Sequence, residues 1–257
     1  MRYTEKLAAR ICAVRSHLCV GLDPRPDLIK EPLKEFLLRA VSECAPHAAC
    51  FKPNIAYFEA LGSRGIALLE EVLNAIPRDI PVLLDAKRSD IGETQKYYAR
   101  AVFETWNCDA VTLNPFLGYD SVEPFLGYEG KGLYLLAVTS NPGAADIEKQ
   151  LLHGGRRVFE LVGDMARRAA GSPADVGFVV GLTNADPDIL PALPDAPLLI
   201  PGLGAQGGDI NALRGSGRAA PALINVSRGV LFPPAGESVA AAAARWQQII
   251  ETALQPN

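Results

Sequence analysis

Eight short apolar runs, spread along the whole chain, constrain the fold more than any other feature of the sequence. Each run ends in a polar or glycine-rich cluster, and most are followed by a stretch with helical periodicity. The runs are LCVGLDP (18–24), ACFKPNI (49–55), PVLLDAK (81–87), DAVTLNPF (109–116), GLYLLAVTS (132–140), VGFVVGLT (176–183), APLLIPGLG (196–204) and ALINVSRG (222–229). Apolar strands that alternate with helices are typical of a parallel sheet that is covered on both faces.

The stretches between the runs predict amphipathic helices. GSRGIALLEEVLNAI (62–76), ETQKYYARAVFETW (93–106) and RRVFELVGDMARRAA (156–170) repeat apolar residues at intervals of three and four. Eight such units predict an α/β fold, a (β/α)8 TIM barrel formed by one domain over residues 1–257, with ESVAAAAARWQQIIETAL (237–254) as its closing helix. The main alternative is a doubly wound open sheet, but no GxGxxG motif joins the first strand to its helix.

Composition and charge exclude several classes of protein. The net charge of −4 gives no electrostatic footprint for nucleic acid or for an anionic membrane. No segment approaches the roughly 18 uninterrupted apolar residues of a membrane span, and the start lacks a signal-peptide pattern, so we expect a cytoplasmic protein. The five cysteines are never spaced as CxxC, and the three histidines lack partners at ligand spacing. Neither a disulfide framework nor a metal site is therefore predicted.

Polar side chains gather where the predicted strands end, which is where barrel enzymes place their sites. Within LLDAKRSDIGET (83–94), Asp85 and Lys87 are two residues apart, so they share one face of a strand. Consecutive barrel strands are usually neighbours, which would place Lys52 beside them. Alternating charges can persist in a desolvated mouth, where an unpaired charge is costly. The alternative is a cluster of ion pairs that only stabilises the rim of the barrel.

Asp90 lies three residues past Lys87, beyond the expected end of the strand. Its side chain could reach back to the site, face solvent or reach a neighbouring subunit. The sequence DIGET also resembles a helix start, in which Asp90 would serve as a cap. The spacing does not choose among these interpretations.

The loops after the seventh and eighth runs, PGLGAQGGD (201–209) and INVSRG (224–229), are rich in glycine. In many barrels these two loops hold a phosphate with backbone N–H groups. Arg228 could add a bidentate contact and Gln206 an amide donor, so we predict a phosphate site here. Alternatively, the glycines only turn the chain and Arg228 pairs with a carboxylate at the rim.

Six sequence blocks, in order along the chain, resemble the orotidine 5′-monophosphate decarboxylase family, in particular its longer bacterial subgroup. The blocks are GLDP (21–24), FKPN (51–54), LLDAKRSDIGET (83–94), TSNPG (139–143), PGLGAQGG (201–208) and SRG (227–229). The resemblance implies a homodimeric barrel that converts orotidine 5′-monophosphate to uridine 5′-monophosphate and CO2. It also implies that this reaction needs neither a metal nor an organic cofactor.

The resemblance implies roles for the matching residues. The alternating charge network would consist of Lys52, Asp85, Lys87 and, from the other subunit, Asp90, with Lys87 as the proton donor to C6 of the pyrimidine. Other residues would bind the substrate. Asp23, together with Lys52, would bind the ribose hydroxyls, Ser140 would bind the pyrimidine edge, and Gln206 and Arg228 would bind the phosphate. Ile91 and Thr94 would reach the site across the dimer interface. The chain departs modestly from the family pattern, at Ser89, Gln95 and Ser227.

Two other functions are compatible with many of these residues. Sugar-phosphate decarboxylases and aldol-type synthases share the D-x-K-x-x-D core but stabilise an enediolate with bound magnesium. The PGLGAQGG and TSNPG blocks favour the nucleotide substrate over that alternative. A non-catalytic barrel that binds a phosphorylated ligand is the second alternative, and it would not require Lys87 for function.

Overall fold

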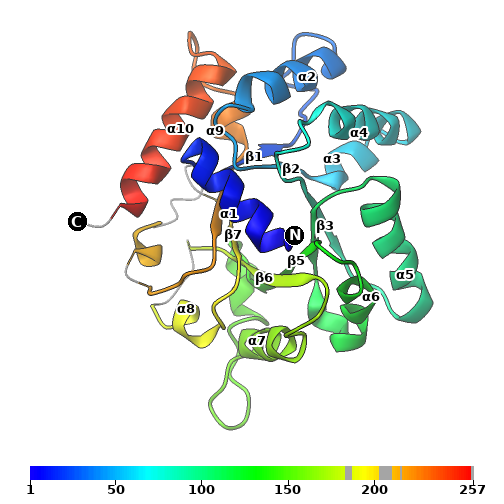
Figure 1. Cartoon of the computed structure of the whole chain (residues 1–257), viewed down its shortest axis with the longest axis vertical. Helices are drawn as coiled ribbons and strands as arrows, with labels where there is room; N and C mark the ends of the chain where they lie inside the picture. Colours follow the sequence, from blue (N-terminus) through cyan, green and yellow to red (C-terminus); the bar gives the residue numbers. More distant parts are fainter. Residues whose placement is uncertain (183–186, 203–209, 215, 256–257) are drawn as a thin grey trace.

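Eight parallel strands surround a common axis, and helices cover them on the outside (Figure 1). The computed structural model describes residues 1–182, 187–202, 210–214 and 216–255. The strands are β1 (Leu18–Leu22), β2 (Cys50–Pro53), β3 (Leu83–Arg88), β4 (Ala110–Leu113), β5 (Gly132–Val138), β6 (Asp175–Val180), β7 (Leu198–Ile200) and β8 (Ala222–Val226). Each lies within one of the eight apolar runs or extends one residue beyond it, so the predicted strands are confirmed.

The strands form a nearly closed barrel. Their order in the sheet is β2-β1-β8-β7-β6-β5-β4-β3. Isolated bridges from Phe51 to Val82 and from Asn54 to Asp85 join the two remaining strands, β2 and β3. The predicted (β/α)8 TIM barrel is therefore confirmed.

The helices are α1 (Tyr3–Val14), α2 (Leu33–Cys44), α3 (Ile55–Glu59), α4 (Ser63–Ala75), α5 (Gly92–Arg100), α6 (Glu123–Leu126), α7 (Val158–Arg168), α8 (Ile189–Ala192), α9 (Arg228–Leu231) and α10 (Val239–Leu254). Most helices connect successive strands and lie outside the barrel, whereas α1 precedes β1 and α10 follows β8. The helix predicted over 93–106 is α-helical only to Arg100 and continues as a π-helical turn over Ala101–Thr105. In the described part of the chain, no helix has the length and apolar character needed to cross a lipid bilayer.

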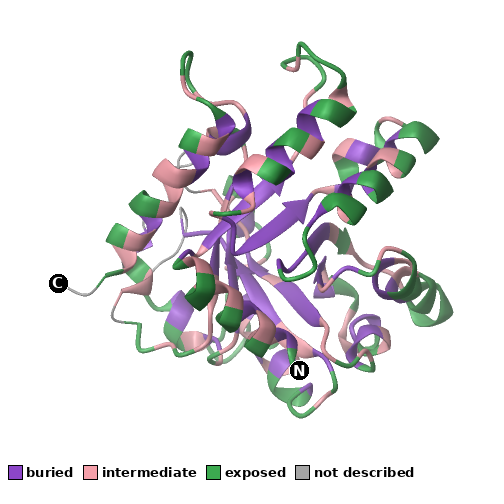
Figure 2. Cartoon of the chain, turned by 45° about the horizontal axis from the view of Figure 1, so that its top comes forward, coloured by how far each residue is buried: buried purple, intermediate pink, exposed green. Residues whose placement is uncertain are grey.

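Side-chain alternation along the strands separates two apolar clusters. Leu18, Val20 and Leu22 of β1 belong to the larger cluster, which joins the strands to the surrounding helices. The smaller cluster lies inside the barrel and receives one residue from each strand: Cys19, Cys50, Leu83, Ala110, Tyr134, Val179, Leu199 and Leu223. The strands are accordingly buried on both faces, whereas the helices expose their outer faces (Figure 2).

Helix α1 closes the amino-terminal end of the barrel. Its Tyr3 and Leu7 side chains are fully buried and belong to the interior cluster. The hydroxyl groups of Tyr3 and Tyr134 lie 3.1 Å apart, and the two rings meet edge to face. Gly132 leaves room for the Tyr3 ring, because a Cβ at this glycine would lie 2.4 Å from a ring carbon. The interior is thus apolar and sealed at this end, which leaves the carboxyl-terminal end for a site.

Replacing Leu7 with alanine should lower the free energy of unfolding by about 2–5 kcal/mol, because a fully buried leucine leaves a cavity when it is truncated. Urea denaturation followed by circular dichroism would measure the loss. Leu161→Ala is a matched control on α7, where the leucine is 39% exposed, and should cost about 1 kcal/mol or less. Equal stability of the two variants would contradict the assignment of α1 to the barrel core.

Candidate active site

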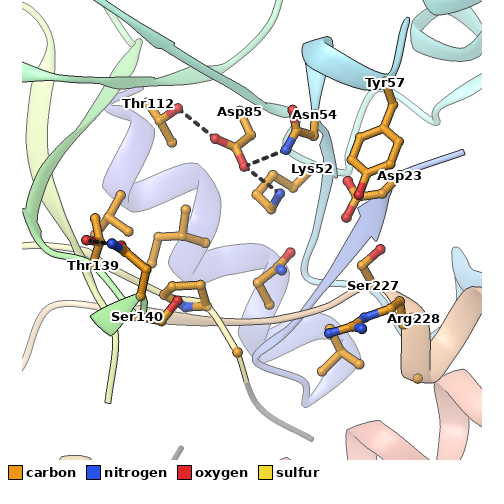
Figure 3. Close-up of a pocket in the computed structure, with 18 of the residues that line it drawn as sticks. Asp23, Lys52, Asn54, Tyr57, Asp85, Thr112, Thr139, Ser140, Ser227 and Arg228 are labelled. Carbon is orange, nitrogen blue, oxygen red and sulfur yellow. Dashed lines mark hydrogen bonds and ion pairs between the residues drawn. The ribbon is translucent and has the colours of Figure 1, made fainter. Parts of the chain in front are cut away.

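The carboxyl-terminal ends of the strands surround a cavity of about 880 Å³. Every strand, or the loop directly after it, contributes to the lining, for example through Asp23, Lys52, Asp85, Thr112, Ser140, Val179, Leu199 and Arg228. Figure 3 shows the polar members of this set grouped around the cavity. The sequence prediction that the strand-end polar residues meet in one place is therefore confirmed for the described ones.

Asp85 lies between two ammonium groups. Its Oδ2 accepts a hydrogen bond from Lys52 Nζ at 3.0 Å, and its Oδ1 accepts one from Lys87 Nζ at 2.5 Å. Asp85 and Lys87 lie together, as predicted, and Lys52 reaches Asp85 from neighbouring β2. Lys52 and Asp85 are only 4% and 9% exposed, whereas the Lys87 side chain is 49% exposed. Lys87 is thus the member of this charge cluster most open to an incoming molecule.

Two neutral donors complete the surroundings of the Asp85 carboxylate (Figure 3). Thr112 Oγ1 donates to Oδ1 at 3.0 Å, and Asn54 Nδ2 lies 3.5 Å from Oδ2. Asn54 also caps α3, because its Oδ1 accepts the backbone N–H of Ala56. Sequence reasoning missed Thr112. Its signal was a polar residue inside an apolar run, two positions after inward-facing Ala110.

Electrostatic attraction outweighs burial in this cluster. Burial alone would raise the pKa of Asp85, but Lys52 and Lys87 hold it well below its ordinary value. Burial would lower the pKa of Lys52, but the carboxylates of Asp85 and Asp23 raise it above its ordinary value. Lys52 and Asp85 are therefore both ionised near neutral pH. The same cavity is also lined by Lys87 and Arg228, and these basic side chains suit an anionic ligand.

Several buried polar atoms of the cavity wall lack hydrogen-bond partners among the described residues. They are Asp23 Oδ1, Asn225 Oδ1 and Ser227 Oγ. Buried polar atoms without partners are uncommon, and they often mark places where water or a ligand binds. Asp23 and Ser227 lie on the side of the cavity where Tyr57 and Arg228 also point inward (Figure 3). Sequence reasoning did not single out Tyr57, which lies on α3, or Asn225. For Asn225, a polar residue near the end of β8 was the available signal.

Arg228 begins α9 and lines the cavity across from β3. Its neighbour Gly229 permits the close approach of α10, because Trp246 Nε1 donates to the Gly229 carbonyl at 2.9 Å. Pro201 and Gly202, the first residues of the PGLGAQGG block, line the same cavity. Gln206, the predicted amide donor to phosphate, lies outside the described residues.

Three of the predicted site residues, Asp90, Ile91 and Thr94, do not line this cavity in the described part of a single chain. The Asp90 carboxylate accepts the backbone N–H of Ile91 at 2.8 Å. Helix α5 has Ile91 at its N-cap position and no side-chain cap, so the interpretation of Asp90 as a cap is wrong. Ile91 is 60% exposed and Thr94 is also exposed, so this segment faces away from its own site.

Comparisons of sequence and of structure agree in the known proteins that they find to be similar to this chain. The sequence model of the "Orotidine 5'-phosphate decarboxylase / HUMPS family" matches residues 16–244. The orotidine 5'-phosphate decarboxylase of Roseiflexus sp. (strain RS-1) is 42% identical over 95% of this chain and 93% of its own length. The structure is similar to Leishmania donovani OMP decarboxylase, with a TM-score of 0.86, 36% identity and full coverage of both chains. A putative orotidine-monophosphate-decarboxylase from Toxoplasma gondii gives a TM-score of 0.89 and 34% identity over 98% of this chain and 96% of its own.

Replacing Lys52 with methionine should lower the free energy of unfolding at pH 7 by about 3 kcal/mol, because it leaves the buried Asp85 with one ammonium partner. Since Asp85 has a lowered pKa in the folded state, its stabilising contribution is present above its unfolded pKa and is lost as pH falls. The difference between wild type and variant should therefore shrink below about pH 4. Urea denaturation of both proteins at pH 7 and at pH 3 would measure this difference in the free energy of unfolding.

The double variant Lys52→Met/Asp85→Asn is the matched control. It removes both buried charges, so it should be more stable than Lys52→Met alone. A Lys52→Met variant with the same deficit at both pH values would show that its stability loss does not come from an ionised Asp85.

Proposed function

Since the chain belongs to the orotidine 5′-phosphate decarboxylase / HUMPS family, we propose that it converts orotidine 5′-monophosphate to uridine 5′-monophosphate and CO2. The observation that carries the proposal is the cluster of Lys52, Asp85 and Lys87 on one side of a cavity that Arg228 also lines. A substrate with a carboxylate on its pyrimidine and a phosphate on its ribose suits these separated cationic groups.

The chemistry proposed for Lys87 follows from the electronic problem of the reaction. When the bond between C6 and the carboxylate breaks, CO2 leaves and the electron pair stays on C6 of the pyrimidine. An ammonium group held beside C6 stabilises that developing charge and then donates a proton to it. Lys87 is suited to this role because its Nζ is fixed by Asp85 while nearly half of its side chain is exposed. Solvent would return the proton to the neutral amine.

The other cavity residues would bind the parts of the substrate that do not react. One carboxylate oxygen of Asp23 has no hydrogen-bond partner among the described residues, so it could accept a hydrogen bond from a ribose hydroxyl. Lys52 would contact the ribose beside it. Ser140 would contact the pyrimidine edge. Arg228 and Gln206 would contact the phosphate. Binding energy from the phosphate can then be used to order the charged groups around C6.

We also propose that a second copy of the chain completes the site. The segments after β3 and β4 expose large apolar side chains, with Ile91 60%, Tyr97 61%, Phe116 71% and Leu117 45% exposed. Exposed apolar side chains of this size suit a protein interface. Because Asp90 lies in the same region and outside its own cavity, it would enter the partner's site together with Ile91 and Thr94.

Decarboxylation in the presence of EDTA is the direct test. Wild-type protein should remove the ultraviolet absorbance of orotidine 5′-monophosphate, and Lys87→Ala should lower turnover by about 100-fold or more, because it removes the proton donor. Lys30→Ala replaces an exposed lysine outside the cavity and should retain full activity. Activity only after added magnesium would instead favour the sugar-phosphate enzymes, and a fully active Lys87→Ala would contradict the role of Lys87.

Mixing two inactive variants tests the shared site. If Asp90 acts in the partner's cavity, a hybrid of Lys87→Ala and Asp90→Ala subunits contains one intact site. After subunit exchange at equal concentrations, activity should recover to about a quarter of wild type, because half of the dimers are hybrids with one working site each. Recovery should be absent when two different Lys87 variants are mixed. No recovery in the first mixture, with exchange verified by mass spectrometry, would place Asp90 in its own subunit's site.

A further inference from the structure

Thr112 occupies a position that the proposed chemistry does not use directly. It lies on β4, is 1% exposed and borders the charge cluster. Its Oγ1 accepts the backbone N–H groups of Ala86 at 3.0 Å and Lys87 at 2.9 Å, and it donates to Asp85 Oδ1 at 3.0 Å. One hydroxyl group thus uses its donor and both acceptor sites on three consecutive residues of β3.

The pairing of β3 with β4 explains why this hydroxyl is needed. Leu84 pairs with Val111, and the next pair joins Arg88 to Leu113. Between these pairs β3 has three residues, 85–87, whereas β4 has only Thr112, so β3 bulges. Two backbone N–H groups in the bulge, those of Ala86 and Lys87, donate to the Thr112 side chain.

The bulge also places Lys87 in an unusual backbone conformation. Its φ is +45°, in the left-handed region that side chains other than glycine rarely adopt. Such strain persists only where surrounding contacts hold it, and it often occurs at functional sites. The hydrogen bond from the Lys87 N–H to Thr112 is a contact of this kind, because it fixes the peptide whose rotation would otherwise relieve the strain.

We propose that Thr112 is a positioning residue for the decarboxylation, which makes this inference depend on the proposed function. By holding the bulge and Asp85 together, its hydroxyl sets where Lys87 Nζ lies relative to the carboxylate. Valine has a similar shape but neither donates nor accepts, so Thr112→Val would release Lys87 into an ordinary extended conformation. Serine keeps the hydroxyl, so Thr112→Ser would keep the bulge.

Steady-state kinetics of three variants tests the proposal. Thr112→Val should lower kcat by about 100-fold, the size of effect that a small misplacement of a catalytic group produces. KM and the affinity for uridine 5′-monophosphate, measured by calorimetry, should change by less than about threefold, because the cavity groups proposed to bind ribose and phosphate are unaltered. Thr112→Ser should restore kcat to within about tenfold of wild type. Ser16→Ala removes a buried, hydrogen-bonded hydroxyl at the other end of the barrel and should leave kcat unchanged.

Crystal structures of the Thr112 variants give a readout that does not depend on activity. In Thr112→Val the φ of Lys87 should become negative and its Nζ should leave Asp85, whereas Thr112→Ser should keep both. An unchanged bulge or an unchanged kcat in Thr112→Val would overturn the proposal, as would an equal loss of kcat in Thr112→Ser. If wild-type protein did not decarboxylate the substrate, the proposed function would fail, and an unchanged bulge would separately show that Thr112 does not position Lys87.

Discussion

The carboxylate of Asp85 is the interaction on which the rest of the site depends. Two ammonium groups, Lys52 and Lys87, would repel each other at the mouth of the barrel without an anion between them. Asp85 in turn would carry a costly buried charge without them. Thr112 and Asn54 occupy positions around the same carboxylate. The cluster therefore forms a unit in which the Asp85 carboxylate holds its four neighbours in place by hydrogen bonds and ion pairs.

The barrel holds this charge cluster on its strands, whose inward-facing side chains change from apolar at one end to polar at the other. Near the amino-terminal end the strands turn small or apolar side chains inward, and α1 seals this layer with Tyr3 and Leu7. Toward the carboxyl-terminal end the inward positions become polar, as the step from Cys50 to Lys52 and from Leu83 to Asp85 shows. Two residues along a strand are thus enough to pass from the sealed core to the candidate site.

Much of this arrangement follows from periodicity in the sequence. Alternation with period two places Asp85 and Lys87 on one face, and the order of strands in a barrel places Lys52 beside them. The role of α1 could not be obtained this way, because the spacing of Tyr3 and Leu7 indicates a helix but not what it covers. The role of Thr112 could not be predicted from the sequence for a related reason. Its hydrogen bonds depend on a bulge in the neighbouring strand, which no local pattern of residues encodes.

The pairing between β2 and β3 differs from the other strand pairings of the barrel. Among the strands that the structure describes, this neighbouring pair is connected by isolated bridges, whereas the other neighbouring pairs form ladders of several paired residues. The ion pair between Lys52 and Asp85 crosses this pairing directly beside the bridge at Asn54. This ion pair therefore helps to hold β2 against β3 and is also part of the candidate site. A ligand that redistributes charge around Asp85 would therefore also change how strongly β2 and β3 are held together. Ligand binding and the stability of the barrel are thus coupled at this pair of strands.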